Sequence, residues 1–313
     1  MIEQLFKALH HYNEAYRELI NEKAMRHTPD HGDFEVFIQS ALKLTKPEDW
    51  GFICSSMDII NDSLLGIEHF CKYGLDGPTK YDDFGEKYIR LYGVLNATYI
   101  QQQALLNLHR IANVMNLRDI ESKVANLQVR EVRNKLGAHS VDYANREAGN
   151  TESFVPVRFT LSGMRCDYYN NTTLQHTEVD LKVILGEHVE LMNDMYDAIY
   201  RKSVGTIYKT NKDKREELLE KIDDAKVLRN GGIVMRTPDG KRIFITTFES
   251  DKQIKSHKPL EVIEVNLSST RFTSLSYDVS SVASRKPIMI ARVGDTQKLA
   301  ARITSSFVAG PNL

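Results

Sequence analysis

The chain has few cysteines and no long hydrophobic run. Its three cysteines, Cys54, Cys71 and Cys166, are odd in number and lack the paired spacing of a zinc site. We therefore expect free thiols in a reducing compartment, without a disulfide framework or a bound metal. No stretch of about 18 apolar residues could form a transmembrane helix, and the first residues are amphipathic and charged, unlike a signal peptide. These absences predict a cytoplasmic protein that does not bind membranes.

An excess of charge of either sign is also lacking. Lysine and arginine total 41 and aspartate and glutamate total 42, so the net charge is −1. Such a chain has no overall field that attracts nucleic acid, and any RNA contact must come from a local basic patch or from one gathered across a dimer. The sequence also contains no Walker loop, no G-x-G-x-x-G, no cysteine pair and no G-x-S-x-G. We therefore expect no cofactor.

Helical periodicity dominates the first two thirds of the sequence. Apolar residues recur at spacings of three and four, and Thr45 followed by Pro47 is typical of a helix start. The expected helices cover residues 2–26, 34–44, 46–71, 88–115, 117–136 and 181–208. Residues 153–180 predict a β-hairpin with Asn170-Asn171 at its turn. The expected fold class is α+β, with residues 1–210 forming a mainly helical domain.

The composition changes after residue 210. A strongly charged segment, 211–228, predicts a connecting helix, and residues 229–313 predict a small β-rich or mixed domain. Two alternating segments, 231–237 and 241–248, flank Pro238-Asp239-Gly240, which is a hairpin signal. Further strands are expected at 260–267 and 287–293, and a closing helix at 296–307.

One polar, partly basic segment, 130–139, carries most of the functional information. It contains Arg133, Asn134 and His139, with Gly137 between them. In an unbroken helix Arg133 and His139 would point about 120° apart. Glycine is a frequent left-handed residue at helix ends, so a helix that ends at Leu136 would let His139 fold back over Arg133 and Asn134. We expect these three side chains to converge.

A guanidinium, an amide and an imidazole together suit phosphodiester cleavage without a metal. Arginine holds a phosphate through two parallel hydrogen bonds, histidine moves a proton near neutral pH, and Asn134 could orient either one. The alternative is that Arg133 and His139 only cap the helix end. Glutamines at 101–103 interrupt the apolar helix 88–115. Three interpretations remain open: the glutamines form a solvated edge, they lie against the Arg133 site, or they lie at an interface between subunits. The expected substrate-binding residues are Arg130, Lys135, Tyr143, Arg146 and Gln102.

The spacing Arg133-Asn134-x4-His139 resembles the R-x4-6-H motif of the HEPN superfamily. The resemblance covers about residues 50–205 and includes the long apolar helix that precedes the motif helix. Some HEPN toxins carry a tyrosine two residues after the histidine; here that position is Val141, so this role is not transferred to Tyr143. The resemblance does not extend to the C-terminal third of the chain and predicts neither its fold nor its role.

The resemblance implies a metal-independent endoribonuclease that leaves 2′,3′-cyclic phosphate and 5′-OH ends. His139 would act as general acid or base and Arg133 would hold the scissile phosphate. It also implies a homodimer paired through the motif helices, and a toxin–antitoxin or antiviral role restrained by an inhibitory or activating protein. The alternatives are a non-catalytic HEPN module that binds RNA or a nucleotide or serves as a dimerising scaffold, and an interaction protein in which Arg133 and His139 only cap a helix.

Overall fold

The protein is mainly helical, with small antiparallel sheets. The computed structural model describes residues 2–79, 82–145, 149–230, 232–236, 242–248, 289–293 and 297–303. The chain divides into two compact units, one formed by residues 2–222 and the other containing the described residues from 223 onward. Within the described part of the chain, no helix has both the length and the apolar character needed to cross a membrane.

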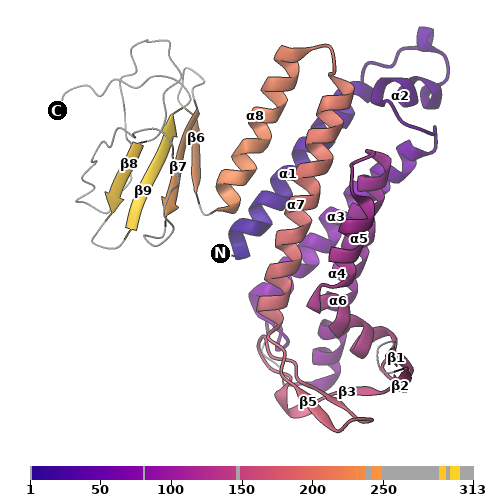
Figure 1. Ribbon diagram of the computed structural model, residues 1–313, viewed down its shortest axis with the longest axis vertical. Coiled ribbons are helices and arrows are strands. Elements are labelled where there is room, and N and C mark those ends of the chain that lie inside the picture. Colours follow the sequence, from indigo (N-terminus) through magenta and orange to yellow (C-terminus); the bar gives the residue numbers. More distant parts are fainter. Residues whose placement is uncertain are drawn as a thin grey trace. The chain divides into compact units, whose positions relative to one another are not determined.

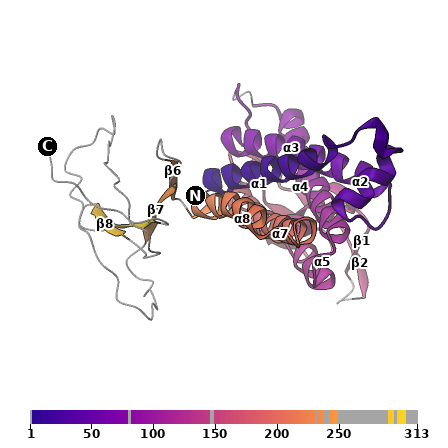
Figure 2. The same cartoon turned by 90° about the horizontal axis from the view of Figure 1, so that it is seen from above.

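Long helices build the first unit. They are α1 (Ile2–Ala24), α3 (Asp49–Tyr73), α4 (Phe84–Ile111) and α7 (Leu181–Ile207), with the shorter α2 (Phe34–Leu42) between α1 and α3. Helix α1 packs against α3 and α7, and α4 packs against α3 and α7 (Figures 1 and 2). The apolar stripes predicted from the sequence face this centre, where the fully buried side chains include Leu9, Ile60, Leu64, Leu105 and Val189.

Carboxylates cap the starts of three of these helices. Asp33, Asp83 and Asp180 each accept hydrogen bonds from backbone N–H groups in the first turn of α2, α4 and α7. The prediction of a Thr45 cap for α3 is wrong, because α3 begins at Asp49. The Asp49 carboxylate instead accepts from the backbone N–H of Lys46 at 3.1 Å, which stabilises a separate turn before the helix.

The helix predicted over 117–136 is broken. It consists of α5 (Leu117–Ala125), α6 (Gln128–Arg133) and a π-helical turn, η2 (Asn134–Ala138). Leu127 is extended, with φ −61° and ψ 133°. In one continuous helix Val124 and Val129 would point about 140° apart. The break allows both of them to be buried, at 1% and 0% exposure.

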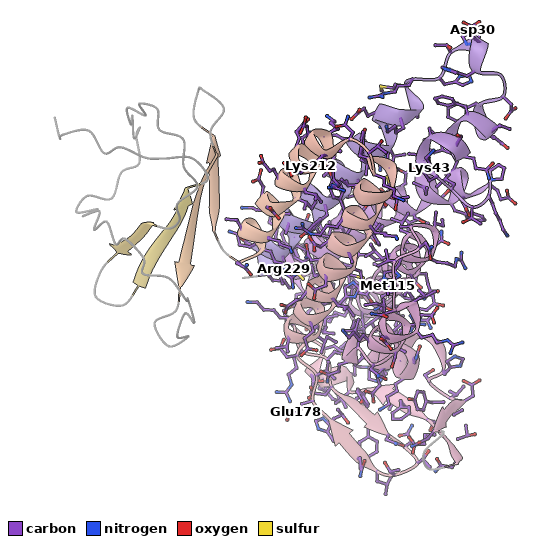
Figure 3. All side chains as sticks on the ribbon, turned by 45° about the horizontal axis from the view of Figure 1, so that its top comes forward. Asp30, Lys43, Met115, Glu178, Lys212 and Arg229 are labelled. Atoms are coloured by element: carbon purple, nitrogen blue, oxygen red, sulfur yellow. The ribbon has the colours of Figure 1, made fainter. Side chains whose placement is uncertain are left out.

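Short strands follow the motif. The polar segment after His139 contains the antiparallel pair β1 (Tyr143–Asn145) and β2 (Asn150–Glu152). A three-stranded antiparallel sheet has the order β3 (Phe154–Pro156), β4 (Tyr168–Asn170), β5 (Gln175–Thr177). The predicted turn at Asn170-Asn171 joins β4 to β5, and a 3-10 helix, η3 (Arg158–Thr160), lies between β3 and β4. This sheet lies at one end of the first unit, with Glu178 beside it and Lys43 at the opposite end (Figures 1 and 3).

The remaining elements are one helix and one sheet. Helix α8 (Lys212–Arg229) confirms the predicted charged helix. The second unit contains an antiparallel sheet whose order is β6 (Ile233–Arg236), β7 (Arg242–Phe248), β9 (Gln297–Ile303), β8 (Met289–Val293). The described parts of three predicted strands, residues 233–236, 242–248 and 289–293, are strands, whereas the strand expected at 260–267 lies outside the described residues.

The prediction of a closing helix at 296–307 is wrong, because the described part of this segment is the strand β9. It pairs with both β7 and β8. Its apolar residues Leu299, Ala301 and Ile303 alternate with Lys298, Ala300 and Arg302, which is the period of a strand. The helical interpretation gave too little weight to this alternation.

Candidate functional site

Two arginines of the motif helix share one aromatic ring. The guanidinium carbons of Arg130 and Arg133 lie 4.3 and 4.1 Å from the ring centroid of Tyr99, on α4. They can both reach the ring because residues three apart occupy the same face of a helix. All three side chains are half-buried. Arg133 also donates from Nη1 to Oδ1 of its neighbour Asn134 at 3.2 Å.

The arginine pair lacks an acidic counterpart within the described part of the chain. Among the described residues, no carboxylate forms an ion pair with Arg130 or Arg133. Burial lowers the pKa of Arg130, the charge of Arg133 lowers it further, and Tyr99 partly opposes both effects. Two guanidiniums held together in a partly desolvated place repel each other. An anion bound between them would relieve that repulsion.

A buried chain of hydrogen bonds holds Arg130 from the core side. Gln102 accepts from Nη1 of Arg130 at 2.9 Å and its Nε2 lies 3.3 Å from Nδ1 of His188. Nε2 of His188 lies 2.9 Å from Oε1 of Gln101, which in turn donates to the carbonyl of Ile60 at 3.2 Å. Gln101, Gln102 and His188 are fully buried. The directions of these hydrogen bonds agree when neutral His188 carries its proton on Nε2, so that each member donates to the next.

His188 stays uncharged in this chain. Complete burial lowers the pKa of its imidazole to about 3. Within this series of hydrogen bonds, the charged member is therefore the guanidinium of Arg130. Of the three places that the sequence left open for these glutamines, the burial of Gln102 and its hydrogen bond to Arg130 favour the one beside the motif segment.

The sequence reasoning missed His188 and Tyr99. His188 lies on the apolar face of α7 among Leu185, Val189 and Met192, where a polar residue requires a partner. Tyr99 precedes Gln102 by one helical turn, and therefore occupies the same face. The apolar surroundings of His188 and the spacing of Tyr99 to Gln102 can both be seen in the sequence, but neither residue belongs to the motif segment 130–139.

His139 does not converge with Arg133. Its side chain is 56% exposed, and its Nδ1 lies 3.4 Å from Oδ1 of Asp142. No hydrogen bond joins the imidazole to Arg133 or Asn134; only the backbone N–H of His139 reaches the Asn134 carbonyl, at 2.8 Å. The role expected for Gly137 is also wrong, because its φ is not positive and it lies inside the π-helical turn. The chain leaves that turn at His139 itself, with φ −129° and ψ 40°.

Lys135 is enclosed by aromatic side chains. Its Nζ lies 4.9, 5.3 and 5.7 Å from the ring centroids of Phe154, Tyr168 and Tyr143. It also contacts the carboxylate of Glu131 at 2.5 Å and the Tyr168 hydroxyl at 3.3 Å. Lys135 and Tyr143, both expected to bind substrate, thus pack η2 against β1, β3 and β4. The expected contact residue Arg146 lies outside the described residues.

One group of side chains has the composition of a metal site. Atoms of Asp167, His176 and Glu178 that could bind a metal lie within 4.8 Å of one another. The guanidinium of Arg165 already donates to Asp167 at 2.6 and 3.0 Å and lies 3.3 Å from Glu178. This cation neutralises the carboxylates where an ion would bind, so the cluster is organised as an ion-pair network.

Comparison with known proteins finds no matching family model, no matching curated protein and no matching solved structure.

Proposed function

We propose that this protein is a metal-independent, HEPN-type endoribonuclease whose Arg130 and Arg133 bind the phosphate backbone of RNA. The observation that carries the proposal is the pair of guanidiniums that shares Tyr99 without any carboxylate partner among the described residues. Arginine binds phosphate through two parallel N–H donors and keeps its charge at every physiological pH. Because Gln102 and Asn134 engage only part of each guanidinium, donors remain for phosphate oxygens.

The reaction would be attack by the ribose 2′-oxygen on the adjacent phosphorus. A new P–O2′ bond forms, the P–O5′ bond breaks, and the 2′ proton is removed while the 5′-oxygen gains one. His139 would carry one of these protons. With Nδ1 facing Asp142, its Nε2 is free for this transfer, and the carboxylate would stabilise the imidazolium that forms. Arg133, oriented by Asn134, would stabilise negative charge on the phosphate oxygens.

The separation of His139 from Arg133 has a consequence for this proposal. The exposed imidazole must meet the phosphate held by the arginines, either when RNA binds or when a second copy contributes its own residues. The homodimer implied by the resemblance would supply the second arrangement, and it would also gather two basic helix ends at one cleft. A dimer is therefore part of the proposal.

The test uses purified protein, total tRNA and a mixed-sequence RNA in the presence of EDTA. We expect cyclic-phosphate ends from the wild type, none from His139→Ala, and reduced amounts from Asp142→Asn. A DNA of the same sequence serves as the control, since it lacks the nucleophile. Cleavage that persists in His139→Ala, or that requires a divalent metal, would refute the mechanism.

A second candidate is a non-catalytic module that binds RNA or a nucleotide. The observation in its favour is that the His139 imidazole contacts neither Arg133 nor Asn134. It predicts tight RNA binding that Arg133→Gln weakens, with no cleavage of any RNA by the wild type. A toxin–antitoxin or antiviral role, with a protein partner that restrains the site, belongs to the first candidate and would appear as cleavage only after that partner is removed.

A further inference from the structure

A concave site lies in the same unit as the motif. A pocket of about 740 Å³ opens between the end of α3, the start of α4 and the segment around η3. This volume is typical of sites for small molecules. Its chemically informative lining residues are Lys72, Tyr73, Phe84, Lys87, Arg158 and Phe159. The motif residues Arg130, Arg133 and His139 do not line it.

The two walls of this pocket are fastened to each other. The carboxylate of Asp76 accepts from the backbone N–H of Gly163 at 2.8 Å, and the N–H of Leu75 donates to the Gly163 carbonyl at 2.8 Å. Gly74 permits this close approach, because it has φ +62° and an added Cβ would lie 2.4 Å from the Gly163 oxygen. The pocket is therefore formed before any ligand arrives, which lowers the entropic cost of binding.

Two cations at the pocket lack an acidic partner among the residues that the structure describes. Lys87 is buried and is neutralised by Asp82 at 2.6 Å and by Asp76 at 3.4 Å. Lys72 and Arg158, by contrast, are exposed and form no ion pair among the described residues. The three cations of the lining, Lys72, Lys87 and Arg158, outnumber its two carboxylates, Asp76 and Asp82, so the net charge that a ligand meets is positive. The site is thus suited to an anion.

An aromatic ring lies beside each of these two cations. Nζ of Lys72 lies 4.9 Å from the Tyr73 ring centroid, and the guanidinium of Arg158 lies 5.6 Å from that of Phe84. Phe159 is 90% exposed and Phe84 is 37% exposed. A phenylalanine this exposed buries almost none of its apolar surface within the chain, and its ring is free to stack on a planar ligand.

We propose that this pocket binds a small organic phosphate that carries an aromatic ring, such as a nucleoside monophosphate. Lys72 and Arg158 hold the phosphate, and the aromatic ring of the ligand stacks on Phe159. Combined cationic and aromatic recognition is how proteins bind nucleotide units without reading their sequence. This inference is independent of the proposed ribonuclease activity, since the two sites share no residue.

The test is isothermal titration of the full chain, at low salt, with adenosine monophosphate, adenosine and inorganic phosphate. We expect the monophosphate to bind more tightly than either fragment. Arg158→Gln and Phe159→Ser should each weaken its binding about tenfold or more, because each removes one half of the recognition. Both positions are exposed, so circular dichroism should show unchanged folding.

Matched controls are Arg118→Gln and Phe52→Ser, an exposed arginine and an exposed phenylalanine that do not line the pocket, and both should bind like the wild type. Arg133→Gln locates the binding, because monophosphate that is held at the motif site would depend on Arg133. Three results would overturn the inference: no saturable binding of the monophosphate, inorganic phosphate binding as tightly as the monophosphate, or binding that depends on Arg133 and not on Arg158 and Phe159.

Discussion

Gly137 lies in a backbone conformation that alanine can adopt. Its φ is not positive, and an added Cβ would meet nothing within 4 Å. Alanine restricts the unfolded chain and favours helix, so Gly137→Ala should raise the free energy of unfolding by up to about 1 kcal/mol. Gly74→Ala is the contrasting variant, because its φ of +62° and its contact with Gly163 should make it strongly destabilising. Urea denaturation of both proteins tests this, and a destabilised Gly137→Ala would mean that the turn needs glycine.

His188 makes stability depend on pH in a defined direction. Its pKa is lowered from 6.5 to about 3 in the folded protein, so below about pH 6.5 the unfolded chain binds a proton that the folded chain does not. Its contribution is therefore complete above pH 6.5 and is lost as the pH falls toward about 3, with a slope approaching 1.4 kcal/mol per pH unit.

The variant His188→Asn isolates this contribution. It keeps a donor and an acceptor between Gln101 and Gln102 but has no proton to gain. At neutral pH the variant should be less stable by about 1–3 kcal/mol, since the shorter side chain leaves buried polar groups poorly paired. The gap should narrow as urea denaturation is repeated at lower pH. Parallel pH profiles of the two proteins would show that His188 is not buried in its neutral form.

At the scale of elements, Lys135 fastens the π-helical turn to the strands that follow it. Its side chain is only 15% exposed, and Glu131 and Tyr168 engage its ammonium group. Lys135→Met keeps the length of the chain but loses these interactions and those with the aromatic rings, and should lower the free energy of unfolding by about 1–3 kcal/mol. Lys123→Met, at an exposed position of α5, is the control and should be nearly neutral.

The same variant tests whether Lys135 binds substrate, as its place in the motif suggested. A lost phosphate contact would weaken RNA binding and reduce its dependence on salt. Because Nζ is already engaged within the protein, we expect RNA affinity to stay within about twofold of the wild type, with an unchanged salt slope. A clear drop in both would return Lys135 to the substrate-binding set.

Local patterns predicted the long helices well. The stripes of α1, α3, α4 and α7 extend over many turns, and each of these four helices lies within a few residues of its predicted bounds. The errors occur where distant packing decides. The break at Leu127 serves the burial of Val124 and Val129, and β9 exists because β7 and β8 flank it. The sequence pattern of one segment shows neither the packing around Val124 and Val129 nor the pairing of β9 with its neighbours.

Local sequence patterns also predicted some residues of the candidate site, but they did not predict how these residues come together. Arg130 and Arg133 were found because their segment is conspicuously polar, and Gln102 because it interrupts an apolar helix. The convergence of His139 with them was inferred from Gly137, and the π-helical turn takes the chain elsewhere. His188 is 86 residues from Gln102 in the sequence, so their hydrogen bond requires the fold.

For the whole molecule, the first part of α8 belongs to the helical unit. The His11 imidazole lies 2.9 Å from the Lys221 carbonyl, the Tyr200 hydroxyl donates to the Leu218 carbonyl at 3.3 Å, and Lys221 pairs with Glu18. The sequence placed a domain boundary at residue 210 and treated 211–228 as a connection. The division at residue 222 moves the start of that helix into the unit that carries the motif.

Two truncated chains distinguish these boundaries. Residues 1–229 retain all of α8 and every described residue of the candidate site, so they should unfold cooperatively and should keep any RNA cleavage or binding that the full chain shows. Residues 1–210 lose Leu218 and Ile222, which are buried at 4% and 0% exposure. Removing these side chains exposes the apolar surface that they cover, at a cost of roughly 1.5–3 kcal/mol for each one.

Thermal unfolding followed by circular dichroism should give a clearly lower midpoint for 1–210. Equal midpoints would mean that α8 is only a connection, and loss of RNA binding in 1–229 would show that residues beyond α8 contribute to the site.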